Sequence, residues 1–345
     1  MLENQFPYFV DWAITEKCNL HCRHCRGMFK GDLSTERAKE LINEIAELHP
    51  RWVIVEGGEP LLREDLFELL GLMQESRLEV HLITNGVLLN SHLITQLKQK
   101  GVRLMISIDG ATPTTYERIR AGASFEKVVQ VAQQCAREGL LEAINFTIMK
   151  TNYKEIPGIF ELAVSIGVPQ ITFIGLKPCH NYPSELLTAD ECGEAIKLAC
   201  EARRKVGGEF FFDEPFFWAV VREYGLPAHT REVSTGILVP STTTCIFGEY
   251  LFVEPSGDVK PCSFSPMAVG NVREKSLPQI WHEMLASPLV KQIKDPETRT
   301  GYCHTCRYLT SCKGCRSRTF ALTGDWFSTD PSCPLSHKAD LKERD

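Results

Sequence analysis

The stretch "YFVDWAITEKCNLHCRHCRG" (residues 8–27) joins a short apolar run to a loop that carries three cysteines in the pattern Cys18-x3-Cys22-x2-Cys25. The run is rich in aromatic and β-branched residues, and its length is typical of a buried β-strand. The loop adds two imidazoles, those of His21 and His24, to the three thiols. Thiolates and imidazoles are ligands for zinc, and thiolates also hold iron–sulfur clusters, so the sequence predicts a strand that ends at a metal site.

The residues that follow repeat this alternation of a short apolar run and a helical pattern. Further runs of strand type lie at residues 52–57, 80–85, 103–109, 143–148 and 170–175. Helical spacing of apolar residues separates them, as in the segment after Ser34, which is a suitable N-cap. Six strand–helix units predict parallel strands covered by helices, that is, an α/β fold of the partial (β/α)6 TIM-barrel type. In such folds the chemistry lies at the carboxyl ends of the strands.

Composition narrows the class of protein. The chain has 345 residues, 43% hydrophobic and 24% charged, with a net charge of −6 and 14 cysteines. No apolar stretch reaches the roughly 18 residues of a membrane span, and the first residues lack the features of a signal peptide. We therefore expect a cytoplasmic protein with no membrane contact, and the absence of a basic stripe argues against a nucleic-acid partner. In a reducing compartment, grouped cysteines are metal ligands before they are disulfides.

The first cysteine group supplies three thiolates, whereas a structural zinc site closes with four protein ligands. A [4Fe–4S] cluster held by Cys18, Cys22 and Cys25 would leave one iron open to another ligand. Zinc with a histidine as the fourth ligand and purely structural cysteines remain alternatives at this point.

This loop resembles the signature of the radical S-adenosylmethionine (SAM) superfamily, and further segments agree with that family in order along the chain. "GGEP" (residues 57–60) resembles the segment that receives the methionine amino group, and "SIDG" (residues 107–110) resembles the one that contacts ribose. Arg120, with Arg118 as the alternative, matches the arginine that pairs with the methionine carboxylate. His24 departs from the family, which usually carries an aromatic ring there. The resemblance implies a SAM site formed by Gly57, Gly58, Glu59, Asn85, Ser107, Asp109, Arg120 and Asn145.

The resemblance also implies a reaction. An external one-electron donor such as ferredoxin or flavodoxin reduces the cluster, SAM is cleaved, and the resulting 5′-deoxyadenosyl radical abstracts a hydrogen atom from the substrate. The cofactors carry this chemistry, and the protein orients them and excludes water. No residue is assigned as a catalytic acid or base.

A second group of seven cysteines lies near the C-terminus and resembles the SPASM extension of radical SAM enzymes. That resemblance implies two auxiliary [4Fe–4S] clusters, and so three clusters in all. The first would be held by Cys245, Cys262 and Cys315, and the second by Cys303, Cys306, Cys312 and Cys333. The chain departs from the pattern in two ways: two residues instead of three separate Cys312 from Cys315, and no cysteine precedes Cys245 in "REVSTGILVPSTTT". The first auxiliary cluster is therefore expected to have an open iron or a ligand of another kind. A zinc site at Cys303–Cys315 is the alternative.

We expect three parts: the radical SAM partial barrel at 1–180, a helical bridge at 181–240, and the SPASM domain at 241–345. "EYLFVEPSGDVKPC" (residues 249–262) predicts a hairpin. The last part has little apolar periodicity and is expected to depend on metal for its order.

Two segments have competing interpretations. "GGEFFFDEPFFWAVVREYG" (residues 207–225) is either a core segment with a proline-initiated helix or a substrate wall that bears two carboxylates. Cys179 and His180 follow the sixth run and either face the cavity or are structural.

The family resemblance leaves the substrate open between a peptide and a cofactor precursor. Alternatives within the family are side-chain modification of haem or another tetrapyrrole and maturation of a tungsten oxidoreductase cofactor. Sulfatase maturation is not expected, because those enzymes carry an aspartate directly after the equivalent of Cys262, where this chain has Ser263. The alternative of another class is a non-catalytic iron–sulfur electron carrier or a zinc scaffold.

Overall fold

The computed structural model describes residues 6–27, 31–178, 183–227 and 244–336. The chain folds into two compact units, each built from separate stretches of sequence. The first comprises residues 1–107, 120–142 and 246–291, and the second residues 108–119, 143–245 and 292–345.

The first unit is built on a sheet in the strand order β10-β9-β8-β1-β2-β3-β4. Strands β8, β1, β2, β3 and β4 pair in parallel, and β8, β9 and β10 pair antiparallel. The strands are β1 (Val10–Ala13), β2 (Val53–Glu56), β3 (Val80–Thr84), β4 (Arg103–Ser107), β8 (Leu251–Val253), β9 (Asp258–Lys260) and β10 (Gly270–Asn271).

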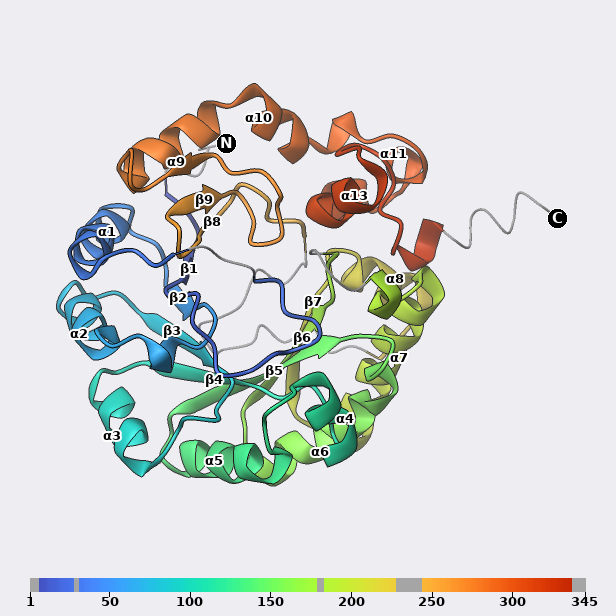
Figure 1. Ribbon diagram of the computed structural model, residues 1–345. Helices are drawn as coiled ribbons and strands as arrows, with labels where there is room; N and C mark the ends of the chain where they lie inside the picture. Colours follow the sequence, from blue (N-terminus) through green and yellow to red (C-terminus); the bar gives the residue numbers. More distant parts are fainter. Residues whose placement is uncertain (1–5, 28–30, 179–182, 228–243, 337–345) are drawn as a thin grey trace. The chain divides into compact units, whose positions relative to one another are not determined.

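Helices cover the outer side of this sheet, and Figure 1 shows α1, α2 and α3 outside strands β1 to β4. The helices are α1 (Thr35–Glu47), α2 (Leu66–Glu75), α3 (Ser91–Gln99), α5 (Phe125–Arg137) and α9 (Leu277–Ala286), with a 3-10 turn η1 (Pro60–Leu62). Ser34 caps α1 as expected, since its side chain accepts a hydrogen bond from the Arg37 backbone N–H. Helix α9, from the C-terminal part of the chain, packs on α1, and there the Leu277 backbone N–H donates to Glu44 Oε2 at 2.7 Å.

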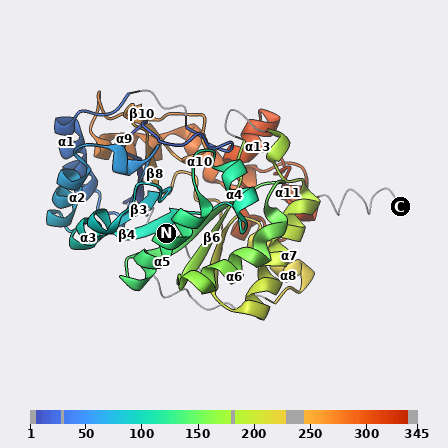
Figure 2. The same cartoon turned by 60° about the horizontal axis from the view of Figure 1, so that its bottom comes forward.

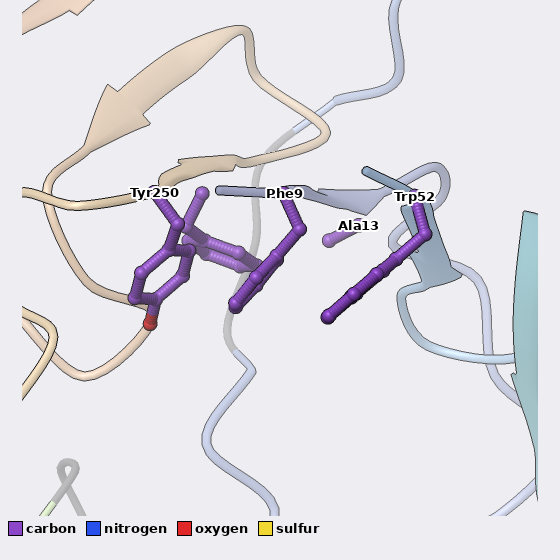
Figure 3. Packing of buried hydrophobic residues seen from close by; sticks show 5 residues of the cluster. Phe9, Ala13, Trp52 and Tyr250 are labelled. Atoms are coloured by element: carbon purple, nitrogen blue, oxygen red, sulfur yellow. The ribbon is translucent and has the colours of Figure 1, made fainter. Parts of the chain in front are cut away.

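An aromatic cluster joins the N-terminal strand to the C-terminal hairpin inside this unit. The rings of Phe9 and Tyr250 stack with centroids 4.4 Å apart, and those of Phe9 and Trp52 are nearly parallel at 5.8 Å (Figure 3). Phe252 is fully buried in the same cluster. Because stacked, buried rings contribute strongly to a core, apolar packing helps to order the hairpin at 249–262, and the dependence of the last part on metal stays a prediction.

The second unit holds three parallel strands in the order β5-β6-β7 and a group of helices. Figure 2 shows α6, α7 and α8 next to β6. The strands are β5 (Leu141–Ile148, from Ala143 onward), β6 (Gln170–Gly175) and β7 (Glu209–Asp213). The helices are α4 (Pro113–Ile119), α6 (Ile156–Ile166), α7 (Ala189–Val206), α8 (Phe217–Tyr224), α10 (Pro288–Lys294, from Gln292 onward), α11 (Tyr302–Thr305), α12 (Leu309–Cys312) and α13 (Arg316–Thr323); the 3-10 turns are η2 (Tyr153–Glu155), η3 (Pro183–Glu185) and η4 (Pro296–Thr298).

All six expected strands are present, and the hairpin at 249–262 is confirmed by the pairing of β8 with β9. The strand β7 and the parallel pairing of β8 with β1 were not expected. The domain boundaries at residues 180 and 240 stay a prediction. The two packing units each combine separate stretches of the chain, so they do not test boundaries along the sequence. Cys179 and His180 lie outside the described residues.

In the part of the chain that the structure describes, no helix has both the length and the apolar character needed to cross a membrane.

Candidate active site

The cysteine loop follows β1 and lies partly open to solvent. Cys18 and Cys25 are exposed and Cys22 is partly buried. The Cys25 backbone N–H donates to the Cys22 carbonyl at 3.2 Å, which turns the loop between these two cysteines. At the start of the loop, Thr15 Oγ1 donates to Asp32 at 2.7 Å. Three thiols are thus presented by one short, anchored segment.

The glycines of "GGEP" lie against the backbone that leads into this loop. The Gly58 N–H donates to the Thr15 carbonyl and the Glu59 N–H to the Lys17 carbonyl, both at 2.8 Å. A Cβ on Gly58 would lie 2.3 Å from the Lys17 carbonyl oxygen, which is impossible without moving the backbone. Glycine is therefore required here for the close approach of two backbone segments.

Glu59 is completely buried and holds the end of β3 in place. Its carboxylate accepts hydrogen bonds from Thr84 Oγ1 at 2.7 Å, from the Asn85 N–H at 2.8 Å and from the Leu61 N–H at 3.2 Å. Burial raises the pKa of Glu59, and these hydrogen bonds act in the opposite direction. The role of Glu59 that the structure displays is to position its neighbours.

Asn85 connects the end of β3 to the cysteine loop. Its Nδ2 donates to Asn19 Oδ1 at 2.8 Å, and its Oδ1 accepts from the Val87 N–H at 3.0 Å. Asn19 lies between Cys18 and Cys22 in the sequence. The side chain of Asn85 therefore fixes the loop that carries the thiols.

Arg120 is buried, whereas Arg118, the alternative, is exposed. Arg120 Nη1 lies 3.7 Å from Cys22 Sγ, so its guanidinium is beside the cysteine loop. Ser107, at the end of β4, is also buried in this unit. Burial and proximity to Cys22 favour Arg120 as the cation of the candidate site.

The second unit holds the other two expected SAM contacts, Asp109 and Asn145. Asp109 Oδ1 accepts from the Thr147 N–H at 2.7 Å, and the Asp109 carbonyl accepts from Asn152 Nδ2 at 3.0 Å. Asn145 Oδ1 is buried and has no hydrogen-bond partner among the described residues. A buried acceptor of this kind needs a donor, and a ligand would supply one.

Four of the C-terminal cysteines line one cavity of about 20 Å³ in the second unit: Cys303, Cys306, Cys312 and Cys333. These are the four thiols expected to hold the second auxiliary cluster. Among the described residues, no three metal-binding side chains converge closely enough to hold a single ion. Four thiols around one cavity match the ligand number of a four-iron cluster, in which each iron takes one thiolate.

The three cysteines of the expected first auxiliary cluster are divided between the units. Cys262 lies in the first unit, packed against the aromatic cluster, and Cys245 and Cys315 lie in the second. Burial raises the pKa of Cys315, while Arg318 and Lys177 oppose this shift and the nearby thiol of Cys245 adds a smaller increase. Cys245 also donates its backbone N–H to the Cys312 carbonyl at 3.1 Å. Each of the 13 described cysteines is free of disulfide bonds.

A buried charge network that sequence reasoning missed lies at the ends of β6 and β7. Arg318 pairs with Asp330 at 2.7 Å and with Glu214 at 2.8 Å, and Lys177 lies 3.3 Å from Glu214. Burial opposes the charge of Lys177, yet Asp213 and Glu214 raise its pKa. Asp330 Oδ2 also accepts the Cys315 backbone N–H at 2.9 Å, so the network supports a candidate cluster ligand. The only sequence signal was the pair of carboxylates in residues 207–225.

The comparisons with known proteins agree with this geometry. Residues 12–163 match the radical SAM superfamily, and residues 245–316 match the iron–sulfur cluster-binding domain SPASM. An AdoMet-dependent heme synthase from Methanosarcina barkeri is 31% identical over 95% of this chain and 96% of its own length. This chain belongs to the radical SAM superfamily.

Other relatives of this radical SAM protein have other substrates in their names. A PqqA peptide cyclase from Granulibacter bethesdensis is 27% identical over 94% of this chain and 86% of its own length. The crystal structure of Streptococcus suis SuiB bound to S-adenosylmethionine superimposes with a TM-score of 0.75 at 15% identity, covering 95% of this chain and 77% of SuiB. At that identity the likeness shows a common fold.

The family assignment confirms several expectations. The protein is a radical SAM enzyme with the α/β fold of the partial (β/α)6 type and a C-terminal SPASM region. Its cofactors are SAM and a [4Fe–4S] cluster, and the SPASM domain binds iron–sulfur clusters as well. A maturase-type role is supported by the relatives, which leaves the substrate open.

Proposed function

We propose that this protein uses SAM to take a hydrogen atom from a tetrapyrrole, as a step in making a haem-type cofactor. The observation that carries the proposal is the 31% identity to an AdoMet-dependent heme synthase, which extends over 95% of this chain and 96% of the relative. The similarity therefore extends over nearly the whole length of both proteins.

When bound, the cluster and SAM supply a 5′-deoxyadenosyl radical for hydrogen-atom abstraction. The protein's part is to hold and orient them. Cys18, Cys22 and Cys25 would ligate the cluster, with Glu59 and Asn85 fixing the loop. Arg120 would pair with the methionine carboxylate, because a buried guanidinium makes strong charge-assisted hydrogen bonds.

The remaining expected contacts have separate roles under the proposal. Gly57 and Gly58 would leave room for the amino group, Ser107 and Asp109 would contact the ribose, and Asn145 Oδ1 would accept a hydrogen bond from the ligand. The auxiliary clusters would be held by two sets of cysteines: Cys245, Cys262 and Cys315, and Cys303, Cys306, Cys312 and Cys333.

Ser263 argues against a peptide reaction of the sulfatase-maturing type. The hydroxyl of Tyr250 accepts the Ser263 N–H at 2.8 Å and donates to Ser263 Oγ at 3.2 Å. This position therefore offers a hydroxyl engaged with Tyr250 in place of the aspartate that sulfatase-maturing enzymes carry.

A peptide is the second candidate substrate, favoured by the 27% identity to a PqqA peptide cyclase. The experiment compares the two classes directly. The anaerobically reconstituted protein is given SAM, dithionite and either iron-coproporphyrin with deuterated side chains or a library of short peptides. Transfer of deuterium into 5′-deoxyadenosine with the tetrapyrrole supports the proposal. Deuterium-free 5′-deoxyadenosine with the tetrapyrrole, together with a modified peptide, would contradict it.

A further inference from the structure

A groove of about 530 Å³ lies in the first unit, between the loop after β3 and one face of α5. The α5 side of the groove is formed by Lys127, Val128, Gln130, Val131, Gln134 and Arg137. These residues recur at three- and four-residue steps, so they share one face of the helix. The groove is large enough to receive side chains of another molecule.

Residues that line the groove lie next to the cysteine loop. On one side it is lined by Gly86, which follows Asn85, the residue that holds the loop through Asn19 at 2.8 Å. On the other side it is lined by Gly122, where an added Cβ would lie 3.3 Å from Leu20 Cδ2. The Ala121 carbonyl, next to Gly122, accepts the His21 N–H at 3.5 Å. The groove is thus adjacent to the loop that carries Cys18 and Cys22.

The charges of this surface are positive, although the whole chain has a net charge of −6. The charged residues that line the groove are the exposed Lys127 and Arg137. The cysteine loop adds the exposed cations Lys17 and Arg23 and one exposed carboxylate, Glu16, so its net contribution is also positive. A positive patch on an acidic protein steers an acidic partner to that patch and slows encounters elsewhere.

The acidic residues of α5 do not cancel this patch. Glu126 lies on α5 but is not among the residues that line the groove. Glu138, directly after the helix, is paired with Lys98 at 2.9 Å. The groove face itself therefore keeps its positive charge.

We propose that this groove is the docking surface for an acidic one-electron donor protein. The donor gives up one electron and is oxidised, and the cluster held by the adjacent cysteine loop gains that electron. No bond in either protein is made or broken in this step. The inference rests on the proposed function, because a donor is required only if SAM is cleaved reductively.

The test uses the reconstituted full-length protein and the double variant Lys127→Glu/Arg137→Glu. Lys291→Glu is the matched control, since Lys291 is an exposed lysine of the first unit outside the groove. SAM cleavage is driven either by an acidic flavodoxin reduced to its hydroquinone or by dithionite, which needs no docking. With flavodoxin, we expect the double variant to form 5′-deoxyadenosine roughly tenfold more slowly and to raise the KM for flavodoxin. With dithionite, we expect the rate of the wild type.

Binding is measured separately by calorimetry with the same flavodoxin at low and high salt. The wild type and Lys291→Glu should bind alike, and the double variant should bind roughly tenfold more weakly, with the difference shrinking as salt rises. Equal loss with both reductants would assign the groove to SAM or substrate, and unchanged binding would place the donor elsewhere; either result overturns the inference. If the wild type fails to cleave SAM with dithionite, the proposed function fails, while the binding experiment still decides the docking surface.

Discussion

Arg120 places a buried cation beside a thiol of the cysteine loop, with Nη1 3.7 Å from Cys22 Sγ. If it pairs with the methionine carboxylate, Arg120→Gln removes a charge-assisted hydrogen bond worth about 1.5–3 kcal/mol. We expect SAM to bind the reconstituted variant about tenfold to a hundredfold more weakly in equilibrium dialysis. Arg118→Gln, a change at an exposed arginine two positions away, should bind SAM as the wild type does. The reverse order of affinities would assign the role to Arg118.

Asp11 is a carboxyl group buried on β1, between Ile54 and Phe252 on the neighbouring strands. Burial raises its pKa from 3.8 to about 7, and the nearby Arg26 opposes this shift. The folded protein thus keeps a proton that the unfolded chain loses above pH 4. Stability is greatest below the unfolded pKa and falls as the pH rises towards 7, by about 1.4 kcal/mol per pH unit.

Asp11→Asn removes this ionisation without changing the size of the side chain. We expect the variant's gain in free energy of unfolding over the wild type to be larger at pH 8 than at pH 5, by about 1–3 kcal/mol. Urea unfolding at the two pH values measures it. A gain that is the same at both pH values would show that Asp11 titrates normally.

At the scale of elements, the end of β6 packs closely against the residue that follows β7, and a glycine makes this contact possible. A Cβ on Gly175, the last residue of β6, would lie 1.8 Å from Glu214 Oε1. Glu214 cannot move aside freely, because Arg318 holds the same oxygen at 2.8 Å. We expect Gly175→Ala to lower the free energy of unfolding by roughly 1–3 kcal/mol.

Gly193→Ala is the matched control for this prediction. Gly193 lies inside α7, and an added Cβ would be 3.4 Å from its nearest neighbour, Pro334 Cβ. Alanine is favoured over glycine in a helix by up to about 1 kcal/mol, so this variant should be as stable as the wild type or more so. Equal effects of the two substitutions in thermal unfolding would argue against a steric contact at Gly175.

The elements that could be predicted are those with a local signal. Strands β1 to β6 appear as apolar runs, and α1 appears with its cap at Ser34. The strand β8 has only three residues, Leu251–Val253, and it pairs with β1, about 240 positions earlier in the chain. Such a distant pairing leaves no trace in a local pattern. The strand β7 lies in the phenylalanine-rich stretch 207–225, where Phe212, Phe216 and Phe217 are buried as a core segment requires.

In the candidate site, too, some features could be predicted from the sequence and others depend on the fold. The resemblance carried by the cysteine spacing proposed candidate ligands, and the structure brings four of them, Cys303, Cys306, Cys312 and Cys333, to one cavity. Side-chain partners could not be predicted in this way. The resemblance placed Glu59 in the SAM site, and only the structure shows that its carboxylate also accepts hydrogen bonds from Thr84 and Asn85. Those bonds depend on how η1 and β3 pack, which motif order does not reveal.

For the whole molecule, the account requires three separate clusters. Full reconstitution should give about 12 irons per chain, four for each cluster. Replacing Cys303, Cys306, Cys312 and Cys333 by alanine should lower the content by about four irons. Metal analysis of the two proteins checks this. Zinc as the main metal in the wild type would favour the scaffold alternative.

The central claim is that the loop of Cys18, Cys22 and Cys25 is where SAM is cleaved. The most direct test is the formation of 5′-deoxyadenosine from SAM under dithionite, measured by chromatography for the wild type and for the variant Cys18→Ala/Cys22→Ala/Cys25→Ala. The account predicts that the wild type forms the nucleoside and that the variant forms none while it keeps its auxiliary iron. Formation of 5′-deoxyadenosine by the variant, or its absence from a wild type with intact clusters, would contradict the account.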